Sequence, residues 1–440
     1  MLESVTLVTR FPSIAVLKYL CHLAKLGHLK PRLHVSTFEA LHSAPVQPSL
    51  REGPLSIVVG ITDSQTCLVL GPRLWALREA GFRVTLVASP GELLEQTAAR
   101  EGVESVALPM KRRLAPLSDL LSLARLWLLL GRLKPDLVEF STPKAGLLGS
   151  VAALLRGVPR RIYLLRGLRL ETATGFRRRA MLAAERLSAA CAHVVLCNSE
   201  SLQRRALELG VAPAAKLAML GDGSSNGVNT EHFAPGLDDV RDRLRLGAKA
   251  QVVGFVGRLT RDKGIPELIE AFDAILKAAP AAFLLLVGWF DESADALGPD
   301  LRKRIQDHPR IHITGYVPDT APYYRAMDVM VLPTWREGFP NVVLEAAATE
   351  VPVVTTLATG ARDSVLPEVT GMLVPPGYPE AIAEAVLKLL GDPERRRRMG
   401  RSARAWVLQH YADARVLRLT TAYYKSLLNT RQAGRAGKPH

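Results

Sequence analysis

The chain has 440 residues, too many for one ordinary hydrophobic core, and this length predicts two domains of about 180 residues each. Its 57 Lys and Arg outnumber 42 Asp and Glu, and the net charge of +15 favours an anionic partner such as phosphate, nucleic acid or an acidic lipid face. The four cysteines form no CxxC pattern and no apolar run is long enough to span a bilayer, which argues against a zinc site, a disulfide framework and a membrane-spanning helix, and favours a reducing cytosol.

Residues 1–52 differ in composition from the rest of the chain. They are rich in His, Pro and Ser and sustain no helical or strand period after Leu26. We expect a poorly ordered N-terminal extension, or one that arises from a start codon assigned too far upstream. Recovery of Met1 or Leu2 on N-terminal sequencing of protein from the native gene would contradict the second explanation.

Strand patterns alternate with helical ones from Leu55 to about residue 234. A helix is expected at about 68–80, and strands are predicted at 56–61, 83–88, 103–108, 137–140, 161–165 and 193–197. This alternation is typical of a parallel sheet covered by helices on both faces. We therefore assign 53–234 to a first, Rossmann-like domain.

A second series follows the polar, glycine-rich segment 221–227, which has the composition of a link between domains. Strands are predicted at 251–256, 282–287, 311–315, 329–332, 353–356 and 371–374. We assign 235–411 to a second Rossmann-like domain and 412–440 to a last helix and tail. The expected fold class is α/β, with two doubly wound parallel sheets facing a central cleft, and ligands in such sheets bind beyond the carboxyl ends of the strands.

Two cations follow the first strand of the second series. The segment 257–264 reads GRLTRDKG and a helix pattern begins at Ile265, which places Arg258 and Lys263 at the mouth of the cleft. Arg can hold two phosphate oxygens at once and Lys acts as a compact point charge, so the two together suit a diphosphate. The alternative is that both are solvated charges on a loop.

Two acids, Glu337 and Glu345, lie eight residues apart in the segment EGFPNVVLE. Gly338 lets the backbone approach a ligand closely, and Pro340 suits the first position of a helix running to about Ala348. The amides at such a helix start can bind phosphate, while the acids can hold ligand hydroxyls. The alternative is a surface turn followed by a half-buried helix.

Together these two segments resemble glycosyltransferase family 4, the retaining enzymes of GT-B fold. The resemblance covers roughly 56–430 and includes Asn226-Gly227-Val228-Asn229, which is similar to the family's NGVD segment between the domains. Asn229 stands where the family has an acid, so no carboxylate role is expected there. The fold also implies that a helix at about 412–428 crosses back onto the first domain.

The resemblance implies a nucleotide-sugar donor, which we expect to be UDP-linked, and assigns roles to residues of this chain. Arg258 and Lys263 would hold the diphosphate and stabilise the charge that develops as it leaves, and Glu337 would contact hydroxyls of the donor sugar. Amides around 338–341 would meet the sugar and phosphates, Glu345 would bind the ribose diol, and 315–317 would form the base-binding loop. The implied donor-binding positions are Gly257, Gly338, Phe339, Pro340, Asn341, Glu345, Tyr316 and Val317.

No DxD motif is evident, so the resemblance implies an enzyme without a divalent metal or another cofactor. Retention in the family is explained by front-face attack, in which the leaving phosphate can take the proton of the acceptor hydroxyl. Glu337 is therefore expected to bind the donor rather than to act as a glycosidase nucleophile.

The first half offers three acceptor-side candidates. The segment Ser141-Thr142-Pro143-Lys144-Ala145-Gly146 resembles the TPKAG segment of the subset that builds capsule and exopolysaccharide, but Phe140-Ser141 and Arg166-Gly167 replace the histidines of those relatives. Arg166 could offer a cation to a diphosphate or pair with Glu171. Asp63, in the first strand turn, is a further candidate beside Lys144 and Arg166.

Basic and apolar residues combine in two other places. Residues 110–113 read MKRR and precede a leucine-rich stretch at 117–133, and 176–179 reads FRRR. These segments could dock on an anionic membrane, although such a helix is more often part of the core, and core is the prediction here.

The sequence thus predicts a cytoplasmic glycosyltransferase, with the inner face of the cytoplasmic membrane as a further location. It would transfer a sugar from a nucleotide diphosphate to a glycan or polyprenyl-diphosphate-linked acceptor during surface polysaccharide assembly. One alternative is a nucleotide-sugar 2-epimerase of the same fold. A basic nucleic-acid-binding protein is the other, but only 6% of residues are aromatic and the arginines are scattered, so no nucleic-acid partner is expected.

Overall fold

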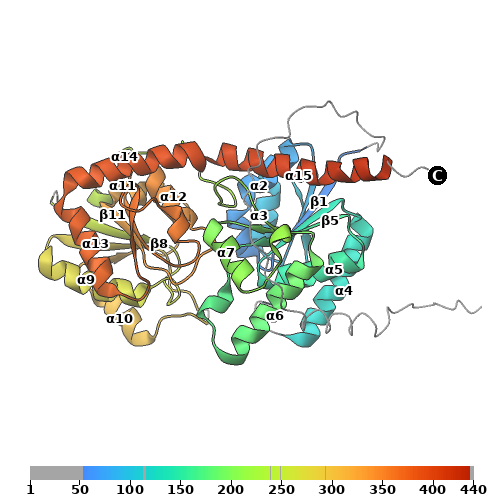
Figure 1. Ribbon diagram of the computed structural model, residues 1–440. Coiled ribbons are helices and arrows are strands. Elements are labelled where there is room, and N and C mark those ends of the chain that lie inside the picture. Colours follow the sequence, from blue (N-terminus) through green and yellow to red (C-terminus); the bar gives the residue numbers. More distant parts are fainter. Residues whose placement is uncertain (1–52, 112–114, 238, 248, 293, 437–440) are drawn as a thin grey trace, which may run out of the picture. The chain divides into compact units, whose positions relative to one another are not determined.

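The computed structural model describes residues 53–111, 115–237, 239–247, 249–292 and 294–436, so the predicted N-terminal extension lies outside the described residues. The described part contains two all-parallel sheets, one of seven strands and one of six, each flanked by helices (Figure 1). This is the α/β class that the alternating pattern predicts.

The first sheet has the strand order β3-β2-β1-β4-β5-β6-β7. Its strands are β1 (Ser56–Gly60), β2 (Arg83–Ala88), β3 (Glu104–Ala107), β4 (Leu137–Ser141), β5 (Arg160–Leu165), β6 (Val194–Cys197) and β7 (Leu217–Met219). The helices are α2 (Gly71–Glu79), α3 (Glu92–Glu101), α4 (Pro116–Leu133), α5 (Pro143–Leu155), α6 (Gly175–Cys191) and α7 (Glu200–Glu208), with short 3₁₀ turns η1 (Ser64–Val69), η2 (Arg169–Thr172) and η3 (Ala214–Lys216). The central strands are buried on both faces because helices cover each side.

The second sheet has the order β10-β9-β8-β11-β12-β13. Its strands are β8 (Gln251–Val256), β9 (Ala282–Val287), β10 (Ile311–Ile313), β11 (Val329–Leu332), β12 (Val353–Thr356) and β13 (Gly371–Val374). The helices are α8 (Val240–Arg243), α9 (Ile265–Ala278), α10 (Pro299–Asp307), α11 (Ala321–Ala326), α12 (Asn341–Ala348), α13 (Pro379–Gly391), α14 (Pro393–His410) and α15 (Asp413–Ala436), with the 3₁₀ turn η4 (Arg362–Ser364).

The strand order of each sheet reverses at one point. In the first sheet β1 pairs with β4, and in the second β8 pairs with β11. At such a point the loops that follow the two neighbouring strands leave toward opposite faces, which opens a crevice at the carboxyl edge of the sheet. The segments 257–264 and 333–341 follow β8 and β11, so the two predicted ligand-binding motifs lie on either side of one crevice.

The last two helices pack on different sheets. Ala403 and Val407 of α14 lie in one apolar cluster with Leu344 and Ala348 of α12. Tyr424 of α15 lies in the core of the first sheet, and α15 packs against α2. Both helices run in sequence along the top of Figure 1. The chain thus returns to the first sheet after completing the second.

The structure differs from the predicted elements at a few boundaries. The helix expected at 68–80 is a 3₁₀ turn followed by α2, because Pro72 lies in the first turn of a new helix. β7 is too short, at three residues, to give a periodic signal. β10 ends at Ile313, two residues before the predicted end, because Gly315 has a φ of 73° that an extended strand does not allow.

The prediction that the leucine-rich stretch at 117–133 is core is correct for one face of α4 and wrong for the other. Only Ser122, Leu126 and Leu130 of α4 are buried. Leu117 is 82% exposed, Leu120 64% and Leu121 59%, so a continuous apolar face of this helix is open to solvent. No helix of the described residues is long and apolar enough to cross a bilayer.

One buried carboxyl makes the stability of the fold dependent on pH. Glu185 of α6 accepts a hydrogen bond of 2.6 Å from the Tyr163 hydroxyl of β5. Burial raises the pKa of Glu185 from 4.5 to about 7, and the Tyr163 hydrogen bond offsets part of that rise. The neutral form therefore fits the folded protein better than the carboxylate does.

We predict that this residue weakens the fold as pH rises. Because the folded-state pKa lies above the unfolded one, the stabilisation is fully present below about pH 4.5 and is lost as pH rises through about 7. Urea unfolding at several pH values should show that the free energy of unfolding of the parent falls by up to about 3 kcal/mol as pH rises. The Glu185→Gln variant should show no such fall. Parallel pH profiles of the two proteins would contradict this assignment.

Candidate functional site

A cavity of about 230 Å³ lies where loops from the two sheets meet. The first sheet contributes the turn after β4, β5 and the loop that follows it; the second contributes the loops after β8 and β11. The residues that line it are Thr142, Pro143, Tyr163, Arg166, Gly167, Leu168, Arg169, Arg258, Asp262, Lys263, Arg336, Glu337 and Gly338. Arg258, Lys263 and Glu337, which the sequence analysis placed at one site, therefore share this cavity.

Lys263 and Glu337 form an ion pair across the crevice between the loops after β8 and β11. Both side chains are largely shielded from solvent, at 20% and 13% exposed. Gly264 ends the first loop with a φ of 76°, and a Cβ there would lie 2.0 Å from the carbonyl oxygen of Pro333. Glycine at this position lets the two loops approach each other, and this approach brings the lysine to the glutamate.

Arg258 and a second arginine, Arg336, each bind an acid of the same sheet. Arg258 donates to Asp291 at 2.7 Å, and Arg336 donates to Asp262 at 2.7 Å. Burial alone would lower the pKa of Arg258, but the hydrogen bond and charge of Asp291 raise it above the ordinary value. Burial tends to raise the pKa of the Asp262 carboxyl. Several opposing effects, the charge of Arg336 foremost, hold that pKa below its usual range. Arg258 and Asp262 are therefore charged at neutral pH.

The start of α12 follows Glu337 directly. Gly338 lines the cavity, whereas Phe339 is buried against Tyr411, with ring centroids 5.2 Å apart. Pro340 caps the helix in an extended conformation and Asn341 is its first residue, one position later than the sequence suggested. No side chain caps this helix start, so its first amides remain available to an anionic ligand.

Four other predicted donor-site residues of the second sheet lie outside the cavity lining. Glu345 accepts a hydrogen bond of 2.8 Å from the Tyr324 hydroxyl, and burial raises the pKa of its carboxyl. Tyr316 is exposed and meets Trp289 edge to face at 5.6 Å, and Val317 packs against the core of the second sheet. Gly257 leaves β8 with a φ of 143° and is likewise not in the lining.

Arg166 is the acceptor-side candidate that reaches the cavity. Its Nη2 donates to Ser225 Oγ at 3.1 Å, while its Nη1 is buried without a partner among the described residues. Burial, and then the charge of Arg73, lower the pKa of Arg166 to about 10. Arg166 does not pair with Glu171, since the Glu171 carboxylate accepts from Arg205 and Thr359.

The other two acceptor-side candidates serve local structure outside the lining. Asp63 caps η1 by accepting a hydrogen bond of 2.9 Å from the Gln65 amide. Lys144 forms an ion pair of 2.7 Å with Asp119 of α4, and both side chains are mostly buried. In the same TPKAG segment it is Thr142 and Pro143 that line the cavity.

Thr142 has an unusual backbone conformation. Its φ is 69°, which is strained for a β-branched residue and costs on the order of 1–3 kcal/mol. Two hydrogen bonds with Thr62 stabilise this conformation. The hydroxyl oxygens of Thr62 and Thr142 lie 2.7 Å apart, and the Thr62 amide donates to Thr142 Oγ1 at 3.1 Å. A strained turn that is held from a neighbouring strand is typical of a functional site.

Sequence reasoning missed several lining residues, among them Asp262, Arg336 and Arg169. Asp262 lies between Arg258 and Lys263 in the GRLTRDKG segment, and a carboxylate among cations is a signal that could have been read. Arg336 directly precedes Glu337. Arg169 belongs to η2, and no motif around it identifies it as a site residue. Only folding brings η2 close to the loops of the second sheet.

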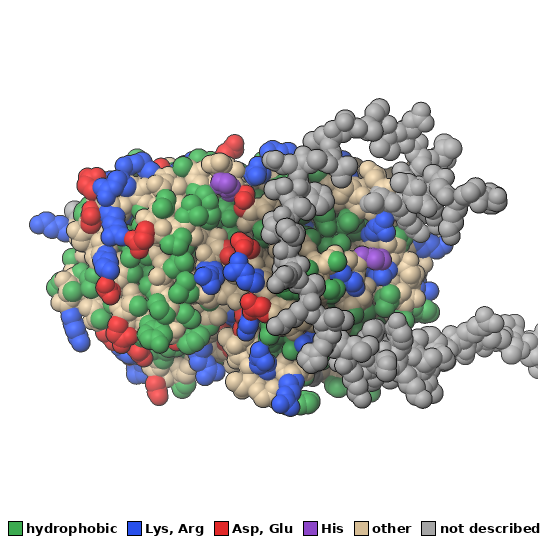
Figure 2. Space-filling view, viewed as in Figure 1, with side chains coloured by type: hydrophobic (Ala, Val, Ile, Leu, Met, Phe, Trp, Pro, Cys, Tyr) green, Lys and Arg blue, Asp and Glu red, His purple; other side chains and the backbone are tan. Residues whose placement is uncertain are grey.

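The cavity is electropositive. It is lined by five cations, Arg166, Arg169, Arg258, Lys263 and Arg336, and by two acids, Asp262 and Glu337. In Figure 2, basic and acidic side chains lie next to one another in the middle of the view. Burial, and then the charge of Arg336, lower the pKa of Arg169, which shows that cations of the two sheets repel each other here. An anionic ligand would relieve that repulsion.

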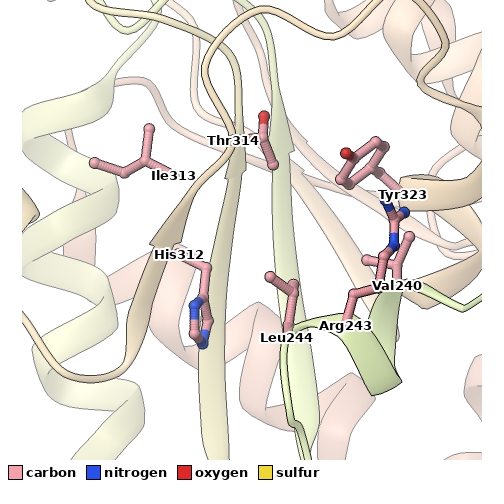
Figure 3. Close-up of a pocket in the computed structure, with 7 residues that line it drawn as sticks. All are labelled: Val240, Arg243, Leu244, His312, Ile313, Thr314 and Tyr323. Carbon is pink, nitrogen blue, oxygen red and sulfur yellow. The ribbon is translucent and has the colours of Figure 1, made fainter.

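A second cavity, of about 210 Å³, lies beside the edge strand β10 and shares no residue with the first. Figure 3 shows His312 of β10 and Thr314, which follows that strand, on one side and Arg243, Leu244 and Tyr323 on the other. His312 stacks on Phe283, and burial lowers the pKa of its imidazole. None of the sequence-predicted site residues lines this cavity.

Two protein families match the chain. The family described as "Glycosyl transferases group 1" matches residues 250–392, and the "Glycosyl transferase 4-like domain" matches residues 75–223. The capsular polysaccharide biosynthesis glycosyltransferase CapM of Staphylococcus aureus is 35% identical over 369 residues, which cover 84% of this chain and 96% of the relative.

Two further likenesses are more distant. The UDP-Gal:alpha-D-GlcNAc-diphosphoundecaprenol alpha-1,3-galactosyltransferase of Escherichia coli is 28% identical over 291 residues, which cover 64% of this chain and 73% of the relative. The crystal structure of HepE from Anabaena in complex with UDP superposes with a TM-score of 0.70 at 19% identity, covering 84% of this chain and all of that one. This last likeness concerns the fold, two facing Rossmann-like domains.

The close approach of two loops at Gly338 generates a prediction. A Cβ at Gly338 would lie 2.2 Å from the carbonyl oxygen of Arg166, and backbone cannot yield as a side chain can. We expect Gly338→Ala to lower the free energy of unfolding by about 1–3 kcal/mol, measured with urea. Gly298→Ala is the matched control because nothing lies within 4 Å of its Cβ position. Equal stability of the two variants would contradict the contact.

Proposed function

This chain is a glycosyltransferase of family 4 with the GT-B fold, and from that membership we propose that it transfers a sugar, with retention, from a UDP-sugar to a glycan or polyprenyl-diphosphate-linked acceptor in surface polysaccharide synthesis. The observation that carries the proposal is the cavity in which Arg258, Lys263 and Glu337 meet the Arg166 loop. The names of the relatives in Staphylococcus aureus and Escherichia coli support the acceptor class.

The donor diphosphate would lie against the second sheet. Arg258 and Lys263 would bind its oxygens, and the uncapped amides at the start of α12 would add positive potential. Glu337, now paired with Lys263, would turn to hydroxyls of the donor sugar when phosphate takes its place at the lysine. Glu345 would bind the ribose diol, and the loop at Tyr316 and Val317 would hold the base.

The reaction would break the bond between the sugar C1 and the phosphate oxygen, with the electron pair going to the leaving diphosphate. The acceptor hydroxyl oxygen would form the new bond to C1 on the same face, and its proton would pass to that phosphate. Preorganised cations stabilise the charge on the leaving group, each good contact being worth a few kcal/mol. In this proposal the fixed cations supply that charge, so no divalent ion is required.

The acceptor would enter from the first sheet, where Arg166 is the acceptor-side candidate in the cavity lining. Asp63 caps η1 and Lys144 pairs with Asp119, so these two residues would act on the acceptor side only indirectly.

A lipid-linked acceptor requires the enzyme to work at a membrane surface, and we place that contact on α4. Leu117, Leu120, Leu121 and Leu128 of this helix are exposed, and Arg125 and Arg132 flank them. Such a face suits the boundary of an anionic bilayer, because the leucines can insert while the arginines meet lipid headgroups. On this proposal the protein acts in the cytoplasm, at the inner face of the membrane.

The two alternatives to this function have less support. A 2-epimerase would share the fold, but both matching families are described as glycosyl transferases. A nucleic-acid-binding protein would need basic and aromatic residues interleaved on one surface, whereas Arg258 and Arg336 of the cavity are paired with acids.

A panel of UDP- and GDP-sugars, incubated with and without a lipid-linked acceptor, tests the function. We expect release of UDP from one donor that depends on acceptor and persists in EDTA. Conversion of a donor to its 2-epimer without acceptor would instead support the epimerase, and salt-sensitive binding of oligonucleotides without effect of UDP would support the nucleic-acid reading.

Substitutions in the cavity test the roles of the charged residues. We expect Lys263→Ala and Glu337→Ala each to lower kcat by about 10²–10³-fold, since each removes a contact to the donor that strengthens as the bond breaks. Lys303→Ala, on the exposed face of α10, is the matched control and should keep parental activity. Nucleotide release at the parental rate by either cavity variant would refute the assignment.

The membrane contact is tested with the intact chain and vesicles. We expect Leu120→Asp together with Leu121→Asp to reduce co-sedimentation with vesicles of anionic phospholipid by at least about tenfold, because two apolar side chains leave the acyl boundary. Leu408→Asp, at a leucine of α14 that is 45% exposed, serves as the control. Unchanged vesicle binding by the double variant would exclude α4 as the docking face.

A further inference from the structure

Arg166 reaches the cavity from a position that other buried residues fix. Its Nη2 donates to the hydroxyl of Ser225, a residue of the segment between the two sheets. The carbonyl oxygen of the same Ser225 accepts a hydrogen bond of 3.0 Å from Arg73 Nη1 of α2. Ser225 is therefore held on one side by Arg73 and itself holds Arg166 on the other.

Behind Ser225 lies a cluster of three buried polar side chains from distant parts of the sequence. Arg73 Nη2 lies 2.5 Å from Glu139 Oε2 of β4, and the Tyr424 hydroxyl of α15 donates to the same carboxylate oxygen. Arg73 is 1% exposed, and Glu139 and Tyr424 are fully buried. The cluster thus joins α2, β4 and the C-terminal helix.

The charges of the cluster do not cancel. The two guanidinium groups of Arg73 and Arg166 share one carboxyl group, that of Glu139, and the charge of Arg73 contributes to the lowered pKa of Arg166. Among the described residues Arg166 Nη1, Arg73 Nε and Glu139 Oε1 are buried without a hydrogen-bond partner. Unpaired buried groups of this kind destabilise a protein, and apolar residues of similar volume are often at least as stable.

A gain in stability therefore does not explain the cluster. Its geometry suggests another role, that of fixing the position of Arg166. Arg166 is the one of these residues that lines the cavity, and its Nη1 has no hydrogen-bond partner among the described residues. A long side chain loses up to about 2 kcal/mol of rotamer entropy when it is ordered, so a guanidinium that is already ordered binds its ligand at a lower entropic cost.

We propose that Tyr424, Glu139, Arg73 and Ser225 are positioning residues that hold the Arg166 guanidinium ready for substrate, so that the C-terminal helix controls a site to which it contributes no lining residue. The proposal rests on the proposed function, in which Arg166 contacts the substrate. It explains why α15 packs a tyrosine, and not a purely apolar side chain, into the core of the first sheet.

A double-mutant cycle in kcat/KM tests the proposal. We expect Arg166→Ala to lower kcat/KM by about 10–100-fold, the range for a lost hydrogen bond to a charged group. Tyr424→Phe and Ser225→Ala should each lower it about 3–10-fold in the parent and less than about twofold in the Arg166→Ala background. Thr420→Val is the control, since Thr420 is buried on the same helix and bonds only within it, to Val416.

The cycle separates positioning from a general loss of stability. A merely structural effect of Tyr424→Phe would persist in the Arg166→Ala background, and that result would overturn the proposal. So would parental activity of both Tyr424→Phe and Ser225→Ala.

Failure of the proposed function is recognised separately. If the parent turns over no sugar donor with any acceptor, the transfer function fails, and the inference is decided by a crystal structure of the Tyr424→Phe variant. Displacement of the Arg166 guanidinium from Ser225 would support positioning. An unmoved guanidinium would overturn it.

Discussion

The contact between two glycine-containing loops sets the geometry on which the site depends. Gly167 follows β5 of the first sheet and Gly338 follows β11 of the second, and their backbones approach so closely that a Cβ at Gly338 would overlap the Arg166 carbonyl. Gly360 also approaches this loop closely, since its Cβ position lies 2.5 Å from the Gly338 oxygen. These contacts narrow the crevice between the two sheets to a small cavity that residues of both sheets line.

This contact also decides the electrostatics of the cavity. Within the second sheet each lining cation has an acid, because Arg258 binds Asp291, Lys263 binds Glu337 and Arg336 binds Asp262. The excess positive charge comes from the first sheet, through Arg166 and Arg169. The net positive charge of the cavity is therefore supplied by the first sheet, and it meets the ion pairs of the second sheet only in the assembled protein.

The buried cluster of Arg73, Glu139 and Tyr424 adds a second connection between distant parts of the chain. Glu139 lies mid-strand in the run Leu137-Val138-Glu139-Phe140, where an isolated acid signals a buried partner. The partner cannot be read from the sequence, because Arg73 is 66 residues away and Tyr424 is 285 residues away. The first sheet, the link and the last helix are thus joined at a point directly behind the cavity wall.

The sequence by itself determined the local part of this protein. Periodicity located both sheets, since the predicted strands at 251–256, 282–287, 329–332, 353–356 and 371–374 coincide with β8, β9, β11, β12 and β13. The family motifs placed Arg258, Lys263 and Glu337 at one site, since both motifs follow strands of the same predicted sheet and ligands bind beyond the carboxyl ends of such strands. These inferences succeed because they depend on contacts within a strand, a turn or an adjacent strand pair.

Only the tertiary structure decided which side chains face the cavity and which serve the fold. Asp63 and Lys144 look as suitable for ligand binding as Arg166, yet one caps a turn and the other pairs with Asp119 of α4. The leucines of α4 likewise suggest a core helix until its neighbours are known, and then Leu117, Leu120, Leu121 and Leu128 prove exposed. The physical reason is the same in each case: burial and pairing depend on residues far away in the sequence, and local periodicity carries no information about them.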